Sequence, residues 1–219
     1  MRFTKEEIKN SMLLYAVTDR TWLKENEDLT AVCESVLVNG ATFLQIREKD
    51  LDEETFEQEA EALKKLCEVH HIPFVVNDSV EIALRIDADG VHVGQSDIKG
   101  RDIRSMIGDE KILGISAGTV EEAILAEKAG ADYIGVGAIF GTSTKKDARN
   151  LTVEKLQEIC ESVSIPVVAI GGITASNIME LSNSGVDGAA VVSAIFASDN
   201  PGEATKKLLN LSKEMVHHG

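Results

Sequence analysis

Cationic and amide side chains alternate at the end of one apolar run, FLQIREK, at residues 43–49. Alternate residues of a strand point to the same face, so Gln45, Arg47 and Lys49 are expected on one side of it. Such a set can hold an anion through charge-assisted hydrogen bonds. A solvated strand end with ordinary salt bridges is the alternative, and Arg47 and Lys49 alone do not decide between the two.

Two aspartates come at the ends of the next two apolar runs. Asn77 and Asp78 end the first of these runs, and Asp97 follows the second. Two carboxylates with amides nearby suit Mg²⁺, which completes its shell with water and substrate phosphate. The alternative is that an aspartate caps the following helix, and Asp78 is the better candidate for that role. His92 lies between two valines and is predicted to pack inside the fold rather than to act as a ligand.

A polar loop follows the sixth apolar run, with the sequence GAIFGTSTKK at residues 137–146. The hydroxyls of Thr142 and Thr144 and the amine of Lys145 could donate several hydrogen bonds to an anion. The loop is not a P-loop, because the Gly-Lys-Ser/Thr ending is missing.

A glycine and a hydroxyl end the last two apolar runs. Gly172 ends the seventh run, and Ser193 lies near the end of the eighth. Barrel enzymes commonly bind a phosphate on backbone N–H groups at this place. A tight turn without a ligand is the alternative for Gly172. Two anion sites result if the second, third and sixth runs form one and the last two form the other, so we expect one phosphate-bearing substrate on each side.

The elements that must position these residues alternate along the whole chain of 219 residues. Short runs rich in Val, Ile and Ala are typical of parallel strands covered by helices, and they occur at 13–19, 43–49, 73–78, 90–95, 112–117, 133–140, 166–172 and 188–194. Segments of helical period separate them. The pattern predicts an α/β fold, a (β/α)₈ TIM barrel forming one domain over residues 1–219. A doubly wound open sheet is the alternative, but eight units in so few residues favour closure.

Several threonines carry the signals of helix starts. Thr119 with Glu122 three residues later predicts a capping box, and Thr152 and Thr174 are predicted N-caps.

Composition limits the partners and the compartment. The formal net charge of −15 argues against nucleic acid and anionic membranes. No segment approaches the roughly 18 apolar residues of a membrane span, and residues 1–19 lack the apolar core and cleavage site of a signal peptide, so none is expected. Cys33, Cys67 and Cys160 lie far apart, as expected for reduced thiols of a cytoplasmic protein. The sequence leaves the oligomeric state open.

Taken together, these segments resemble the thiamine-phosphate synthase family. The resemblance rests on the ordered set LQIREK, VND, GVHVGQSD, GISA, GAIFGTSTKKDA and PVVAIGGI, and it extends from LYAVTDRTW to VVSAIF. It implies a Mg²⁺-dependent transferase that condenses 4-amino-2-methyl-5-pyrimidinylmethyl diphosphate with 4-methyl-5-(2-phosphoethyl)thiazole. The products would be thiamine phosphate and pyrophosphate, formed by dissociative loss of the diphosphate.

The resemblance also implies a role for each site residue. Asp78 and Asp97 would bind Mg²⁺. The catalytic residues would be Arg47, Lys49, Ser116 and Lys145. The pyrimidine and its diphosphate would be held by Gln45, Arg47, Lys49, Asn77, Ser116 and Lys145. The thiazole phosphate would be held by Thr142, Thr144, Gly172, Val192 and Ser193.

Three positions bear on the competing interpretations. Ala138 and Gly141 stand where many relatives have proline, and both leave the Thr-x-Thr-Lys pattern intact. Gly118 stands where the related thiazole tautomerase, the nearest alternative, has a histidine. A barrel that binds thiazole or thiamine phosphates without turnover is a further alternative. The retained aspartates and polar loop favour the synthase.

Overall fold

Eight parallel strands close into a barrel in a computed structural model that describes residues 3–25, 27–141 and 151–217. Each strand pairs with its sequence neighbours, and β1 closes the ring by pairing with β8, Tyr15 opposite Ala190. The strands are β1 (Leu14–Val17), β2 (Phe43–Ile46), β3 (Phe74–Asn77), β4 (Gly90–Val93), β5 (Ile112–Ala117), β6 (Tyr133–Gly137), β7 (Val167–Ile170) and β8 (Gly188–Val191). The predicted (β/α)₈ barrel is confirmed, and all eight predicted runs contain a strand.

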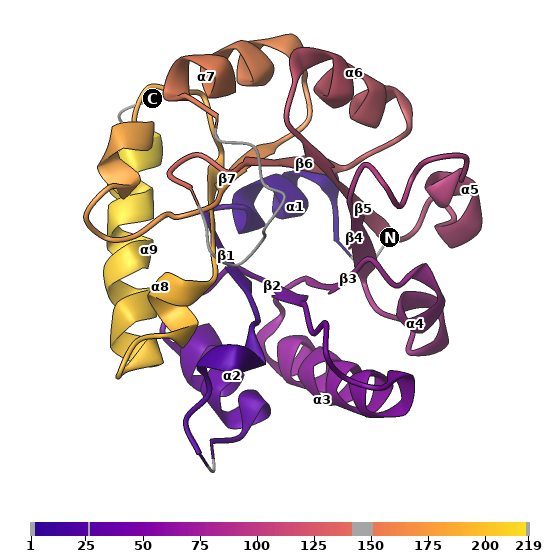
Figure 1. Ribbon diagram of the computed structural model, residues 1–219, viewed down its shortest axis with the longest axis vertical. Helices are drawn as coiled ribbons and strands as arrows, with labels where there is room; N and C mark the ends of the chain where they lie inside the picture. The colour runs from indigo at the N-terminus through magenta and orange to yellow at the C-terminus, as the bar shows by residue number, and fades with distance from the viewer. Residues whose placement is uncertain (1–2, 26, 142–150, 218–219) are drawn as a thin grey trace.

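Helices surround the strands as an outer layer (Figure 1). They are α2 (Leu29–Val38), α3 (Glu53–His70), α4 (Val80–Arg85), α5 (Ile103–Ile107), α6 (Val120–Lys128), α7 (Val153–Ser162), α8 (Ser193–Phe196) and α9 (Pro201–His217). Two 3₁₀ helices, η1 (Arg20–Trp22) and η2 (Ile178–Leu181), lie after β1 and β7. None of the described helices is both long enough and apolar enough to cross a bilayer.

Side-chain caps begin most of these helices, and they test the predicted starts. Thr152 caps α7 by accepting from the backbone N–H of Lys155, as predicted. Thr119 caps α6, but the carboxylate of Glu122 accepts from the N–H of Gly118, so the predicted capping box is wrong. The prediction for Thr174 is also wrong, because the chain after β7 forms only η2, whose N-cap position is Asn177.

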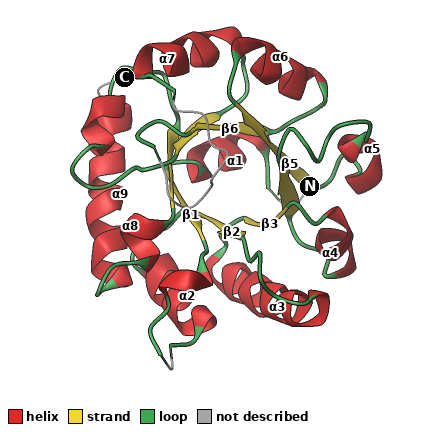
Figure 2. Ribbon diagram, viewed as in Figure 1, coloured by secondary structure: helices red, strands yellow, loops and turns green. Residues whose placement is uncertain are grey.

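Two apolar clusters account for the packing. The larger one lies between the strands and the outer helices. The smaller one fills the barrel interior and includes Tyr15, Phe43 and Tyr133, together with Ile8 from α1 (Lys5–Ser11). Helix α1 lies across the ring of strands when the barrel is viewed end on (Figure 2). The barrel is therefore a filled core, and the space for a ligand is left at its carboxyl end.

Candidate active site

A cavity of about 430 Å³ opens where the strands end. It brings together every predicted site residue that falls within the described ranges. These residues are Gln45, Arg47, Lys49, Asn77, Asp78, Asp97, Ser116, Gly172, Val192 and Ser193. Thr142, Thr144 and Lys145 lie outside the described residues. The structure thus places ten residues from six strand ends around one space, while the ligand of each stays a prediction.

The cationic side of the cavity lies beyond β2 rather than on it. The strand ends at Ile46, so the expectation that alternation along a strand aligns Arg47 and Lys49 with Gln45 is wrong in its premise. All three nevertheless line the cavity. The turn is held by the buried Thr18, whose hydroxyl accepts from the Arg47 N–H at 2.9 Å and donates to Glu48 Oε1 at 2.9 Å.

A buried acidic residue supports the same turn from behind. The side chain of Glu48 is only 2% exposed, and its Oε2 lies 3.5 Å from Nε of Arg20. Arg20 also contacts Glu59 at 2.5 Å. Burial raises the pKa of Glu48, while the hydrogen bond from Thr18 and the charge of Arg20 oppose that shift. Thr18 and Arg20 were not recognised from the sequence, although the polar pair Thr18-Asp19 at the end of the first run marks a strand end.

The two aspartates face the cavity at neighbouring strand ends. Ser79 caps α4 by accepting from the N–H of Ile82, so the capping alternative for Asp78 does not hold. Asp78 has a left-handed backbone with φ of 62°, and its N–H donates to the His92 carbonyl at 2.8 Å. Asp97 is held by the Gly94 N–H, which donates to its Oδ2 at 2.8 Å.

Electrostatics at this pair suit a divalent cation. The pKa of Asp78 is raised, first by burial and then by the negative charge of Asp97, while Asn77 and Lys49 act in the opposite direction. A buried carboxylate beside a second negative charge at the edge of a cavity is stabilised in its ionised form when a cation lies between the two. Mg²⁺ takes one or two protein carboxylates together with substrate phosphates, so these residues fit that ion.

The opposite side of the cavity contains a glycine turn after β7. Gly171 and Gly172 have φ of 101° and 66°, conformations that favour glycine. Asn177 braces the turn, because its Nδ2 donates to the Gly172 carbonyl at 2.9 Å and its Oδ1 accepts from the Thr174 N–H at 2.8 Å. The Phe140 N–H donates to the Gly171 carbonyl at 3.1 Å and joins this turn to the loop after β6. Asn177 was not recognised from the sequence.

A hydroxyl completes that side. Ser193 is the first residue of α8 and follows directly on Val192, and both line the cavity. Gly172 and Ser193 therefore lie at neighbouring strand ends, where a phosphate could take hydrogen bonds from backbone N–H groups and a hydroxyl.

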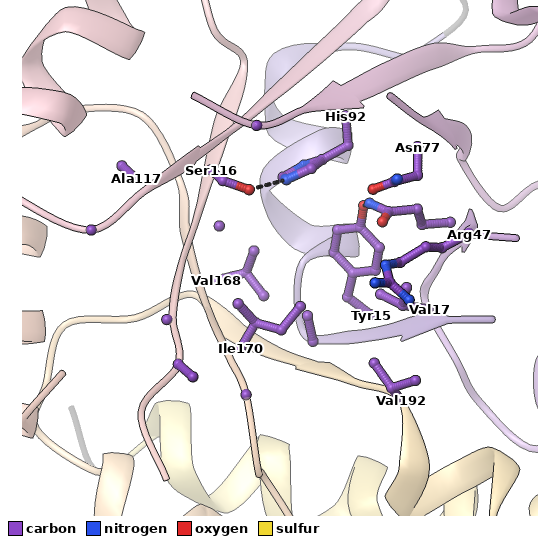
Figure 3. A pocket seen from close by; sticks show the side chains of 18 of the residues that line it. Tyr15, Val17, Arg47, Asn77, His92, Ser116, Ala117, Val168, Ile170 and Val192 are labelled. Carbon is purple, nitrogen blue, oxygen red and sulfur yellow. Dashed lines mark hydrogen bonds between the residues drawn. The ribbon is translucent and has the colours of Figure 1, made fainter. Parts of the chain in front are cut away.

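His92 lies at the floor of the cavity. It is buried, as predicted, and its Nε2 lies 2.9 Å from the hydroxyl of Ser116 (Figure 3). Its Nδ1 lies 3.0 Å from the hydroxyl of Tyr133. Tyr15 also lines the cavity, and its contact with Gln45 was not foreseen. For His92 the flanking valines predicted packing only.

The chain matches proteins of one enzyme family over nearly its whole length. The family model described as thiamine monophosphate synthase matches residues 14–195. A thiamine-phosphate synthase of Clostridium botulinum is 47% identical over 195 residues, covering 89% of this chain and 91% of the relative. A protein of the same name from Ruminiclostridium cellulolyticum is 48% identical over 198 residues, covering 90% of this chain and 94% of the relative.

A solved structure agrees with these relatives. The thiamine phosphate pyrophosphorylase of Pyrococcus furiosus superposes with a TM-score of 0.87 at 37% identity, covering 95% of this chain and 99% of that chain. The barrel fold and the length of these matches lead to one conclusion. The chain belongs to the thiamine monophosphate synthase family.

Proposed function

We propose that this chain joins 4-amino-2-methyl-5-pyrimidinylmethyl diphosphate to 4-methyl-5-(2-phosphoethyl)thiazole, releasing pyrophosphate. The C–O bond between the pyrimidine methylene carbon and the diphosphate breaks, and its electron pair leaves with the oxygen. The ring nitrogen of the thiazole then forms a C–N bond to that carbon with its lone pair. No proton needs to be removed, so the reaction requires neither a protein nucleophile nor a general base.

Arg47 and Lys49 would act on the leaving group. Negative charge grows on the diphosphate as the C–O bond breaks, so a fixed cation beside it binds the transition state more tightly than the substrate. The hydrogen bond from the Arg47 N–H to Thr18 holds this turn in place before substrate arrives. Lys145 is assigned the same role by the family resemblance alone.

Asp78 and Asp97 would hold Mg²⁺ beside the same group. When bound there, the ion would offset diphosphate charge, a contribution of several kcal/mol. The Gly94 N–H fixes Asp97, and the backbone of Asp78 is tied to β4 through the His92 carbonyl.

The thiazole phosphate would bind across the cavity, on the Gly172 turn and Ser193. Thr142 and Thr144 are assigned to the same phosphate by the resemblance. Gln45, Asn77 and Ser116 would contact the pyrimidine ring. This arrangement would place the two phosphate groups on opposite sides of one space, with the reacting atoms between them.

One observation carries the proposal: a single cavity presents cations and paired carboxylates on one side and a braced glycine turn with a hydroxyl on the other. An isomerase acting on the thiazole alone would not use the first set. A binding protein without turnover would not need groups aimed at a leaving diphosphate.

The test is direct. Purified protein is mixed with both substrates and Mg²⁺, and thiamine phosphate and pyrophosphate are measured by chromatography. We expect equimolar formation of the two products, and none when either substrate is omitted. Tight binding of both substrates without product, or isomerisation of the thiazole phosphate alone, would refute the proposal.

A further inference from the structure

Five polar side chains form a continuous chain of hydrogen bonds through the barrel interior, from β2 to β5. Gln45 Nε2 donates to the Tyr15 hydroxyl at 2.6 Å, and that hydroxyl lies 2.7 Å from the hydroxyl of Tyr133. Tyr133 lies 3.0 Å from Nδ1 of His92, whose Nε2 lies 2.9 Å from the Ser116 hydroxyl. We call these five residues the interior relay. Its two ends, Gln45 and Ser116, line the cavity.

Glycines in β5 and β6 make room for the relay. A Cβ at Gly114 would overlap the Tyr133 ring and would lie 2.5 Å from Nδ1 of His92. A Cβ at Gly135 would lie 3.2 Å from Cε1 of His92. The strand register sets Gly114 opposite both His92 and Tyr133. The space that the His92–Tyr133 hydrogen bond occupies therefore depends on a residue without a side chain.

The donor and the acceptor of each hydrogen bond in the relay can be assigned from the number of hydrogens that each group carries. The Gln45 nitrogen carries only hydrogens, so the Tyr15 oxygen accepts there and its own hydrogen goes to Tyr133. The Tyr133 hydrogen then goes to Nδ1 of His92. A neutral His92 consequently carries its proton on Nε2 and donates to Ser116. Any other assignment leaves one buried phenol hydrogen without a partner in the relay, which is costly because both tyrosines are at most 1% exposed.

We infer that Tyr15, Tyr133 and His92 are positioning residues that fix opposite hydrogen-bonding roles on the two ends of the relay. Ser116 accepts from His92 and is left to donate its hydrogen into the cavity. The Gln45 amide is turned so that its nitrogen meets Tyr15 and its oxygen can accept from a ligand.

These roles define a ligand class. An acceptor at Gln45 and a donor at Ser116 complement a flat heteroaromatic ring that carries an amino group and a ring nitrogen. This inference rests on the proposed function, since it assigns the aminopyrimidine to these ends. It adds how hydrogen bonds inside the barrel, including those of Tyr133, which does not line the cavity, set the orientation in which the ring is accepted.

The first test needs no substrate. In protein labelled with ¹⁵N-histidine, two-bond ¹H–¹⁵N spectra distinguish a protonated from an unprotonated ring nitrogen, and a His92→Gln spectrum assigns His92 among the five histidines. We expect Nε2 protonated and Nδ1 unprotonated. A proton on Nδ1, or on both nitrogens, would overturn the inferred direction.

The second test asks whether the core reaches the substrate. Tyr133→Phe removes one hydroxyl and keeps the ring, so we expect mixed His92 tautomers and an increase of roughly 2- to 13-fold in the KM for the pyrimidine diphosphate, the factor of one net hydrogen bond. The KM for the thiazole phosphate should not move. In a Ser116→Ala background the same substitution should have almost no effect, because the end that it orients is gone. Equal effects in both backgrounds would overturn the proposal.

Two further variants keep the test decisive. Tyr15→Phe cuts the relay at its other tyrosine and serves if Tyr133→Phe does not fold. Val75→Ala is the packing control, because Val75 belongs to the same interior cluster but does not line the cavity. It should lower the Tm without changing the His92 tautomer or either KM. If the KM for the pyrimidine diphosphate shifts as much in Val75→Ala as in Tyr133→Phe, the effect is due to packing and the proposal is wrong.

Failure of this inference differs from failure of the proposed function. If the wild-type protein forms no thiamine phosphate, the proposed function fails, and the His92 spectrum still decides the direction of the relay. If the wild-type protein is active but His92 carries its proton on Nδ1, only the relay inference fails.

Discussion

Substituting Gly172 by alanine should separate backbone strain from damage to the second phosphate side. Gly172 has φ of 66°, and an added Cβ would lie 2.8 Å from the Phe140 carbonyl oxygen and closer still to that of Gly141. Gly100 is the matched control, because its φ is 76° and an added Cβ would meet nothing within 4 Å. The two variants share an unfavourable backbone conformation, and only one of them adds a collision.

The magnitudes follow from these contacts. A left-handed alanine costs about 1–2 kcal/mol, and each kcal/mol lowers the Tm of a chain of this size by about 2–4 °C, so Gly100→Ala should lose about 2–8 °C. Gly172→Ala should lose more, because two fixed carbonyls must also move. If the displaced turn loses one hydrogen bond to a phosphate, about 1.5–3 kcal/mol, the KM for the thiazole phosphate should rise roughly 10- to 150-fold.

Thermal melts and steady-state kinetics at saturating pyrimidine diphosphate measure both quantities. Gly100→Ala should keep the thiazole KM of the wild-type protein. The reasoning is refuted if Gly172→Ala shows the wild-type thiazole KM, or if Gly172→Ala and Gly100→Ala melt at the same temperature.

Four further predictions concern charge and hydroxyl groups. Treatment with EDTA should abolish turnover and Mg²⁺ should restore it, and full activity without metal would contradict this. Asp97→Asn should raise the Mg²⁺ concentration needed for turnover, because only the carboxylate of Asp78 is then left to bind the ion. Ser193→Ala should raise mainly the thiazole phosphate KM, whereas a shift confined to the pyrimidine diphosphate KM would reverse our assignment. Lys145→Ala should lower kcat by about 10²–10³-fold with little change in Tm, and an unchanged single-turnover rate would limit that lysine to substrate capture. Burial raises the pKa of Glu48 above 4.5, so its contribution to the free energy of unfolding falls as pH rises through the folded-state pKa. Denaturant titrations should therefore show Glu48→Gln gaining stability relative to wild type as pH rises above the ordinary carboxyl pKa, and a gain toward low pH would contradict this.

The sequence predicts the barrel because strand runs and helix signals act locally. Most of the eight runs are rich in Val, Ile and Ala, and the segments between them carry helix caps such as Thr152. The errors also have local causes. Thr174 has the residue type of a cap, but its N–H donates to Asn177 Oδ1, and the helix that follows, η2, begins only at Ile178.

The candidate site is predicted less evenly. Polar residues at the ends of apolar runs stand out, so Asp78, Asp97 and Arg47 are found without a structure. Thr18 and Asn177 are not found, because they act through backbone groups of residues distant in sequence or beyond a turn. Their role depends on the register of the strands and on side-chain rotamers, neither of which a run of residue types specifies.

The hydrogen bonds of the interior relay could not be predicted from the sequence. Tyr15 and His92 each lie between apolar neighbours and Tyr133 begins an apolar run, which is the pattern of packed core residues, and the structure does bury all three. Packing alone would leave their polar atoms without partners at a cost of about 1–3 kcal/mol each. The closed barrel removes that cost, because β1, β4 and β6 bring these three groups together in the interior and Gly114 of β5 leaves space between His92 and Tyr133. The chain of hydrogen bonds that joins these groups ends at two polar side chains, Gln45 and Ser116, which line the cavity. The same hydrogen bonds that make the core satisfiable therefore connect it to the residues that we expect to contact the substrate.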